Sequence, residues 1–332
     1  MMNAEQGQSA PAHSGAGSPR AAANDEPRLG GILGAGLGSA LLFSASLLAP
    51  FLFLLGMASP LPLVLQRLRG GLSGALLSGA LAAALLAAVF TPGQGVAFAL
   101  VLGLPGLVIG ETMARGRGLL RGCALAFLVL STEISLALLL ASGPMAQNFL
   151  QPLEQFRSPQ FLEDLKASGL PPEQVTDWTD KMTTLRDALA IVFPAAHIIA
   201  GGLIVLLNGA LLRLYLLRRD PGWLEDGEFE RVRFPLVLAA SFVLAGAAVL
   251  VEPLRAVAYN ALLVQAFFFG LQGLAVVTFY ARRLAGPPFL RAVVVVLVLA
   301  NPWAVQILAL LGLFDNWIDF RKWAEPPETR GA

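Results

Sequence analysis

Long apolar runs separated by short polar connections dominate the chain. Because a helix needs about 20 apolar residues to cross a bilayer, eight runs qualify as spans: 32–57, 71–90, 96–113, 119–141, 188–217, 234–251, 256–280 and 289–314. A ninth run, 60–65, is too short for an ordinary crossing and is either a short, tilted or re-entrant helix or no span at all. The pattern predicts an all-α fold, a polytopic transmembrane helix bundle with eight to nine spans.

One long polar segment interrupts the apolar pattern. Within it, apolar side chains recur at steps of three and four, which is typical of a helix with one apolar stripe: Val175, Trp178, Met182, Leu185 and Leu189. Pro171 and Pro172 stand where such a helix would begin. We expect a helical extracytoplasmic insertion, which serves as a lid or docking surface or simply rests on the membrane or the bundle.

These patterns divide the chain into five parts. Residues 1–28 are rich in Ala, Gly, Ser and Pro and form a tail that we expect to be disordered. An N-terminal transmembrane bundle (29–141), the extracytoplasmic helical segment (142–187), C-terminal transmembrane helices (188–320) and a polar tail (321–332) follow.

Short basic clusters indicate the orientation, because cytoplasmic loops carry an excess of Lys and Arg. Three clusters fall on one side by parity: Arg115, Arg117 and Arg121; Arg213, Arg218, Arg219, Arg231 and Arg233; Arg282, Arg283 and Arg291. That side is predicted to be cytoplasmic. In run 289–314 the Asn301-Pro302 pair kinks or breaks the helix. We expect a kinked single span with the tail outside; a hairpin would return the tail inside.

Composition agrees with a lipid environment. Hydrophobic residues make up 56% of 332 residues and charged residues 14%, with a mean hydropathy of +0.69, whereas soluble domains carry roughly a quarter charged residues. The net charge of +1 and the absence of a basic block give no sign of nucleic-acid binding. The single Cys123 cannot form an intramolecular disulfide, and no metal-ligand spacing or cofactor motif appears.

Polar residues inside apolar runs are the candidate binding residues, because a charge in hydrocarbon usually faces protein or water. Glu133 lies near the middle of run 119–141, beside Ser131, Thr132 and Ser135. It is interpreted either as a contact to a ligand, proton or cation or as a hydrogen-bonded packing residue.

Two further pairs share helix faces. His197 and Asn208 lie eleven residues apart in run 188–217, about 20° apart around an ideal helix. Gln265 and Gln272 lie seven apart in run 256–280. Each residue is interpreted as a ligand contact or as an interhelical hydrogen bond. The sequence contains no Ser-His-Asp set, paired catalytic carboxylates or HExxH helix, so an enzyme is not expected.

Four stretches carry a family resemblance. They are the turn Pro60-Leu61-Pro62 leading through Arg67 to Gly70-Gly71, Gly103-Leu104-Pro105-Gly106, Phe193-Pro194 after an acidic segment, and the ending from Leu311 to Lys322. In these the chain resembles the YybS-like family of bacterial inner-membrane proteins, which has no established function. The resemblance implies a multi-pass protein of the bacterial inner (plasma) membrane.

The amino-terminal half of that family is similar to the substrate-binding S components of energy-coupling-factor vitamin transporters. The shared pattern is a short Pro-flanked second helix followed by a Gly-rich third. This implies a fold that binds a small solute, although the chain departs from S components by its extra carboxyl-terminal spans and outer insertion. No ligand motif carries over residue by residue.

Two functions therefore stand as hypotheses. The first is a small-solute transporter or substrate-binding membrane subunit, which needs a partner ATPase or an ion gradient because no nucleotide-binding motif is present. The second is a membrane scaffold or envelope-assembly protein that acts on a partner membrane protein through helix–helix contacts. Small residues four apart, such as Gly30, Gly34 and Gly38, suit either packing within the bundle or dimerisation.

Overall fold

The computed structural model describes residues 28–224, 229–283 and 301–324, and these contain helices and no strand. Within these described residues, six helices are long and apolar enough to cross a membrane: Leu29–Leu48, Phe53–Val89, Pro92–Ala114, Leu119–Leu140, Pro172–Arg219 and Glu252–Arg283. Two shorter apolar helices are Leu236–Ala248 and Trp303–Ile318. The predicted all-α transmembrane bundle is confirmed, while the number of eight to nine spans stays a prediction.

Helices α1 (Leu29–Leu48), α2 (Phe53–Met57) and α3 (Leu61–Val89) begin the N-terminal bundle. The prediction of a single span over residues 32–57 is wrong at its carboxyl end. Helix α1 stops at Leu48, just before Pro50, and a 3₁₀ turn, Pro50–Leu52, leads into α2. Proline lacks the amide hydrogen that would continue the helix.

The short run 60–65 belongs to a reversed pass. Gly70 and Gly71 are non-helical inside α3, and they divide α2–α3 into a first leg (53–69) and a second leg (71–89). The first leg runs antiparallel to α1, with Gly31 against Gln66 and Gly38 against Pro62. The second leg runs parallel to α1, because Ser78 Oγ donates to Ile32 O (3.1 Å) and Leu81 lies against Gly36.

The next segment packs through small residues. It comprises α4 (Pro92–Ala97), a π-helical stretch (Phe98–Gly103) and α5 (Leu104–Ala114). Gly95 lies against Ala83 and Ala87, and Gly106 lies against Pro60. The glycines allow the backbones to approach closely, whereas Gly30 and Gly34 have no neighbour within 4 Å of an added Cβ.

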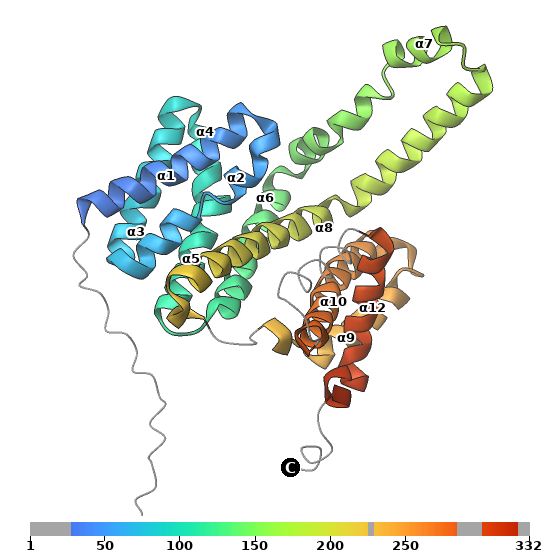
Figure 1. Cartoon of the computed structure of the whole chain (residues 1–332). Coiled ribbons are helices and arrows are strands. Elements are labelled where there is room, and N and C mark those ends of the chain that lie inside the picture. Colours follow the sequence, from blue (N-terminus) through green and yellow to red (C-terminus); the bar gives the residue numbers. More distant parts are fainter. Residues whose placement is uncertain (1–27, 225–228, 284–300, 325–332) are drawn as a thin grey trace, which may run out of the picture.

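Two very long helices form an arm that leaves the bundle (Figure 1). Helix α6 (Leu119–Gln155) and helix α8 (Pro172–Arg219) run antiparallel, and α7 (Pro159–Ala167) joins them at the far end. Gly201 of α8 packs against Leu130 of α6, and Gly209 packs against Cys123. The polar insertion is therefore helical as predicted, and both long helices continue from it into apolar sequence.

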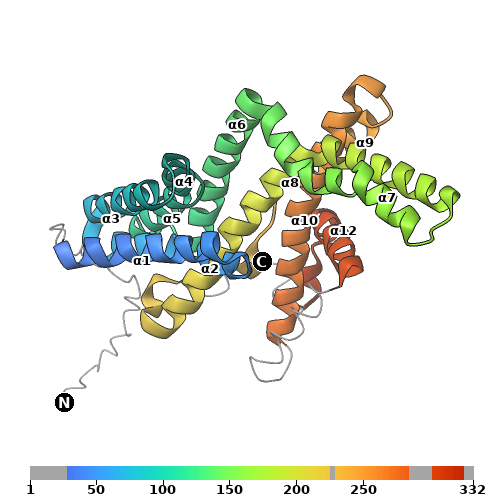
Figure 2. The same ribbon diagram turned by 90° about the horizontal axis from the view of Figure 1, so that it is seen from above.

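Helices α9 (Leu236–Ala248), α10 (Arg255–Arg283) and α12 (Pro302–Ile318) form the C-terminal bundle. In the view from above they lie on the opposite side of α8 from α1–α5 (Figure 2). Gly273 of α10 packs directly on the Leu308 backbone of α12, and Gly312 of α12 packs on Phe269.

The prediction of a kink at Pro302 is wrong, because Pro302 begins α12. Asn301 caps the helix with its Oδ1 atom, which accepts from Trp303 N (3.0 Å). Residues 289–300 of that predicted span lie outside the described residues.

The prediction of an outside tail is also contradicted. Arg321 Nε donates to Glu230 O (2.9 Å), so Arg321 lies beside the basic cluster that includes Arg231 and Arg233.

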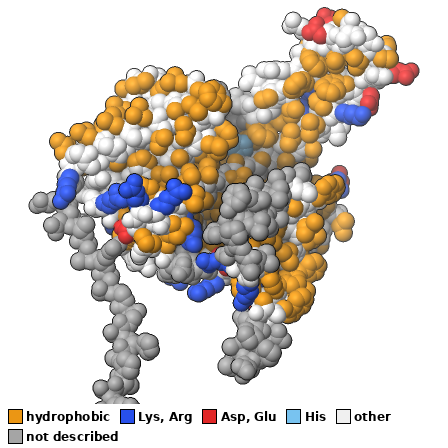
Figure 3. All heavy atoms as spheres, viewed as in Figure 1, with side chains coloured by type: hydrophobic (Ala, Val, Ile, Leu, Met, Phe, Trp, Pro, Cys, Tyr) orange, Lys and Arg blue, Asp and Glu red, His pale blue; other side chains and the backbone are white. Residues whose placement is uncertain are grey.

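Many basic residues gather at one end of the bundle, called here the basic end, whereas Arg157, Lys166, Lys181 and Arg186 lie on the arm. Arg67 and Arg115 both pair with Glu111 there (2.6 Å each), and Arg282 pairs with Glu230 (3.2 Å). Figure 3 shows Lys and Arg side chains along the lower part of the molecule and acidic side chains at the tip of the arm. This distribution agrees with the orientation predicted from the sequence.

The reversal at Gly70 and Gly71 predicts a labelling pattern. In a Cys123→Ala background, Arg69→Cys, Gly116→Cys and Trp323→Cys should react with an impermeant thiol reagent from the same face of oriented membranes. Gly93→Cys should react from the opposite face. Labelling of Arg69→Cys from the face that labels Gly93→Cys would show that residues 53–89 do not cross twice.

Gly71 should tolerate no side chain. Its φ of +78° and ψ of 173° lie in a region used almost only by glycine, so Gly71→Ala should lower the free energy of unfolding by about 1–3 kcal/mol. Gly79→Ala is the matched control, because an added Cβ lies 3.7 Å from Leu63 in ordinary contact. Thermal unfolding in detergent should show no loss of stability for the control. Equal losses of stability in both variants would contradict the prediction that backbone strain at Gly71 causes the effect.

Candidate functional site at interrupted helices

Side-chain amides complete the backbone where helices are interrupted within apolar segments. Helix α8 contains Pro194, which has no amide hydrogen. Beside it, Asn260 of α10 donates from Nδ2 to Ile191 O (2.7 Å) and accepts at Oδ1 from Ala195 N (2.8 Å). Asn260 therefore takes the place of a backbone hydrogen bond at this break.

Gln272 does the same at the start of α9. Its side chain is fully buried on α10. The Oε1 atom accepts from Phe234 N (2.9 Å), and Nε2 donates to Asp315 Oδ2 (2.9 Å). Both ends of the Gln272 amide are thus paired, which identifies it as an interhelical tie.

Asn208 of α8 donates a hydrogen bond to the backbone at the break between α2 and α3. Its Nδ2 atom donates to Met57 O (2.9 Å) and to Ile204 O (2.9 Å). Met57 O needs this donor because Leu61 N bonds to Ala58 O instead. The Oδ1 atom of Asn208 is buried and has no hydrogen-bond partner among the described residues. This amide therefore forms hydrogen bonds through its nitrogen but not through its oxygen.

A small cavity adjoins Asn208. Its volume is about 10 Å³, and its lining comes from three helical segments: Pro60, Val101, Leu102, Pro105, Gly106, Ile109, Ile204, Val205 and Asn208. Pro105 supplies no amide hydrogen, so the turn from Val101 to Pro105 lacks its α-helical bond. Ser59, beside Pro60, is fully buried with its Oγ unpaired. Unused oxygens therefore gather around this break.

The break lies deep within the apolar layer. Gly38 is midway along α1, and it lies against Pro62 of the first leg. Gly106 lies against Pro60 and is likewise far from both ends of the Pro92–Ala114 span. Irregular backbone at this depth is tolerated only where it is buried in protein or lines a cavity.

The other sequence-predicted residues lie elsewhere. Glu133 is half-buried on α6, and its Oε2 has no hydrogen-bond partner among the described residues. It neighbours Ile134, which packs on Gly201. Gly201 lies seven residues from Asn208, or about 10 Å along an ideal helix. Glu133 and Asn208 therefore occupy different levels.

His197 and Gln265 make local or pairwise contacts. His197 Nδ1 lies 3.0 Å from Phe193 O, and its ring packs on Phe149 of α6 and on Phe193. Gln265 Nε2 donates to Ser241 Oγ of α9 (2.9 Å), while its Oε1 is unpaired. The five predicted residues do not meet in one site. In the described residues no group of three or more His, Cys, Asp or Glu could hold a metal ion.

Sequence reasoning missed a buried charge at the basic end. Asp315 of α12 is fully buried. Its Oδ2 accepts from Arg321 Nη1 (2.6 Å) as well as from Gln272, and Oδ1 accepts from Phe320 N (3.2 Å). Arg233 ties the same region together through Asp319 Oδ2 (3.0 Å) and Asp315 O (3.0 Å). The alternation of Asp, Arg and Lys after an apolar run was the only sequence signal.

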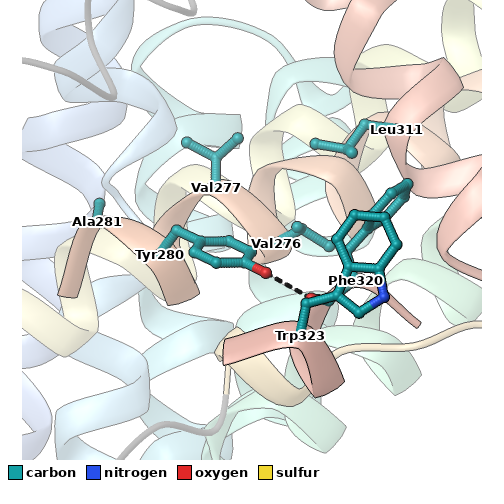
Figure 4. A pocket seen from close by; sticks show the side chains of 7 residues that line it. All are labelled: Val276, Val277, Tyr280, Ala281, Leu311, Phe320 and Trp323. Atoms are coloured by element: carbon teal, nitrogen blue, oxygen red, sulfur yellow. Dashed lines mark hydrogen bonds between the residues drawn. The ribbon is translucent and has the colours of Figure 1, made fainter. Parts of the chain in front are cut away.

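An apolar groove of about 420 Å³ lies beside this network (Figure 4). Helix α10, helix α12 and the 3₁₀ turn Phe320–Ala324 line it. Tyr280 donates its hydroxyl hydrogen to Phe320 O across the groove (Figure 4). Aromatic residues lie next to basic residues in this part of the sequence, as is typical of a membrane interface: Trp317, Phe320 and Trp323 beside Arg321 and Lys322.

Comparison with known proteins gives one match. The family described as predicted membrane protein (DUF2232) matches residues 39–316, which is most of the chain. No curated protein and no solved structure matches.

The Asp315–Arg321 pair should be strongly coupled. Arg321→Gln leaves a buried carboxylate without its cation and should cost about 3–5 kcal/mol in free energy of unfolding. Adding Asp315→Asn removes that charge and should restore part of the loss. Chemical unfolding of both single variants and the double variant in detergent measures the coupling. Additive losses would show that the two side chains do not act as a pair.

Proposed function

The chain belongs to the DUF2232 family of predicted membrane proteins, and on that premise we propose that it is a small-solute transporter or the substrate-binding membrane subunit of one. The site of this proposal is the break between α2 and α3 that faces Asn208. One observation carries it: Asn208 Oδ1 is buried beside a cavity deep in the apolar layer and has no hydrogen-bond partner among the described residues.

An unpaired acceptor at this depth costs free energy, so a ligand that donates a hydrogen bond there is favoured. The Ser59 hydroxyl adds a group that can donate or accept. Interrupted helices near the bilayer midplane are where many transporters bind solutes and ions. The chemistry fits a small neutral or cationic solute with at least one N–H or O–H donor.

The cavity in this form is closed. A volume of about 10 Å³ is roughly the space that one water molecule needs. A larger solute therefore requires α8 to move away from Met57 and Pro60. At Pro194, where Asn260 replaces a backbone hydrogen bond, α8 is weakest against bending, and this point lies about four turns from Asn208.

Glu133 extends the proposal toward the arm. Its Oε2 has no partner among the described residues, and its neighbour Ile134 packs on Gly201, which lies about 10 Å along α8 from Asn208 on the side of the predicted outer face. We assign Glu133 a contact on the route between that face and the break. His197, Gln265 and Gln272 act in this proposal as packing and positioning residues, because their contacts are interhelical or local. Gln265 also has a buried Oε1 without a partner among the described residues, but it does not line the cavity at Asn208.

The resemblance to S components supports the same proposal. It suggests a multi-pass protein of the bacterial inner membrane that works with a partner ATPase or an ion gradient. Scaffolding is the second candidate, favoured by the arm formed by α6, α7 and α8, which projects from both bundles (Figure 1). In that case a partner protein would dock on the arm, and Asn208 would serve only as a helix tie.

Ligand-dependent stabilisation separates the two candidates. Purified protein is screened by thermal shift against vitamins, nucleobases, amino acids and monovalent cations. The transporter proposal expects at least one compound to raise the melting temperature of the wild type and of the control Gln265→Leu. Asn208→Leu should lose that shift, because the acceptor is gone.

The outcomes against it are equally clear. A ligand that stabilises Asn208→Leu as much as the wild type would place the site elsewhere. A screen without any stabilising compound, combined with stoichiometric recovery of a partner that is lost when residues 156–172 are replaced by a short linker, would favour the scaffold.

A further inference from the structure

A second cavity lies at the basic end of α8. It has a volume of about 380 Å³ and is lined by Leu214, Tyr215, Arg218 and Arg219 in the last turns of the helix. Arg218 and Arg219 are exposed, and Leu214 is 58% exposed. The cavity thus joins an apolar wall to guanidinium groups at the level where a lipid headgroup meets its acyl chains.

A second helix brings another arginine into contact with Tyr215, one of the residues that line this cavity. Arg69 is the last residue of the first leg, just before the break at Gly70 and Gly71. Its Nη2 atom donates to the Tyr215 hydroxyl (2.9 Å), and its guanidinium lies 5.7 Å from the centre of the Tyr215 ring. Tyr215, which lines the cavity together with Arg218 and Arg219, therefore holds the Arg69 guanidinium.

The arginines around this cavity form no ion pair with a described carboxylate. Other arginines at the basic end do have carboxylate partners, as in Arg67–Glu111, Arg233–Asp319 and Arg282–Glu230. Among residues 28–224, 229–283 and 301–324, Arg69, Arg218 and Arg219 form no ion pair with a carboxylate. An anion is therefore the ligand that the local electrostatics favour.

We propose that this cavity binds the phosphate headgroup of an anionic phospholipid, with its acyl chain along Leu214 and Leu217. Arginine clusters between transmembrane helices near the cytoplasmic surface suit such headgroups, and guanidinium forks bind phosphate oxygens in pairs. Leu217 is 48% exposed and continues the apolar wall. The negative end of the α8 dipole repels an anion, so the arginines supply the attraction.

Lipid binding is measured by native mass spectrometry and by fluorescence titration in phosphatidylcholine nanodiscs with and without phosphatidylglycerol. The wild type should bind phosphatidylglycerol selectively. Arg218→Gln with Arg219→Gln should lose about fivefold in affinity for each arginine removed. The matched control, Arg117→Gln with Arg121→Gln, removes the same charge from exposed positions on the α5–α6 turn and in the first turn of α6 and should retain binding.

Two more variants distinguish a loss of lipid binding from a folding defect. Arg218→Lys with Arg219→Lys keeps the charge and should retain most of the affinity. Tyr215→Phe keeps every charge but releases Arg69, so it should lose affinity without loss of net charge. Melting temperatures in pure phosphatidylcholine show whether each variant is folded.

Three outcomes would overturn the proposal. Equal losses in the Arg218/Arg219 variant and in the control would indicate diffuse surface charge. Unchanged affinity in Tyr215→Phe and in the Arg218/Arg219 variant would exclude this cavity. Inorganic phosphate that binds lipid-free protein in detergent, with the same arginine dependence and displacing phosphatidylglycerol, would identify a soluble anion site instead.

Discussion

The constraint that shapes this protein is that every backbone N–H and C=O inside a bilayer needs a partner from the protein itself, because lipid offers none. The chain interrupts its helices at Met57–Pro60 and Pro194, and α9 begins beside α10. At each place a carboxamide from a neighbouring helix supplies what the backbone lacks: Asn208, Asn260 and Gln272. A carboxamide suits this task because it carries both donors and an acceptor on one short side chain.

The three amides differ in how many of their hydrogen-bonding atoms have partners. That difference distinguishes the amides that only join helices from the one proposed to contact a ligand. Asn260 and Gln272 are paired through both nitrogen and oxygen. Asn208 pairs through nitrogen alone, and its oxygen is unpaired beside a cavity. An unused acceptor in a medium without water is costly, so it is retained most readily where occupancy by a solute or water compensates for it. Composition alone would have ranked these residues equally.

The sequence predicts most of the helices, because spans in lipid are long and nearly uniform in polarity. It fails where an apolar run continues through a helix end, as at Leu48, where α1 stops inside the run predicted from 32 to 57. Arg67, Arg69 and the two glycines mark the boundary before the span predicted from 71, but they do not show that the segment before them runs antiparallel to α1. The site was predictable only in part. Asn208 stands out as a polar residue in an apolar run, but its partner, Met57 O, is a backbone atom 151 residues away. Asn260 lies 65 residues from the interruption that it completes, and Asp315 appears as an interfacial residue until Gln272 and Arg321 are seen to surround it.

Under the proposed function, the same constraint would link binding of a solute at Asn208 to movement of α8. This helix contacts α2 and α3 on one side and α10 on the other, and the C-terminal bundle is fastened at the basic end by the Asp315–Arg321 pair. If α8 moves away from the break, Met57 O loses the Asn208 amide and becomes an unpaired acceptor in hydrocarbon, at a cost of several kcal/mol. Water or a solute that donates to Met57 O removes that cost. An empty site therefore favours the closed arrangement, and a bound donor favours the open one. In this way a helix break that is paired only from a neighbouring helix can couple occupancy to conformation without any charged residue at the site.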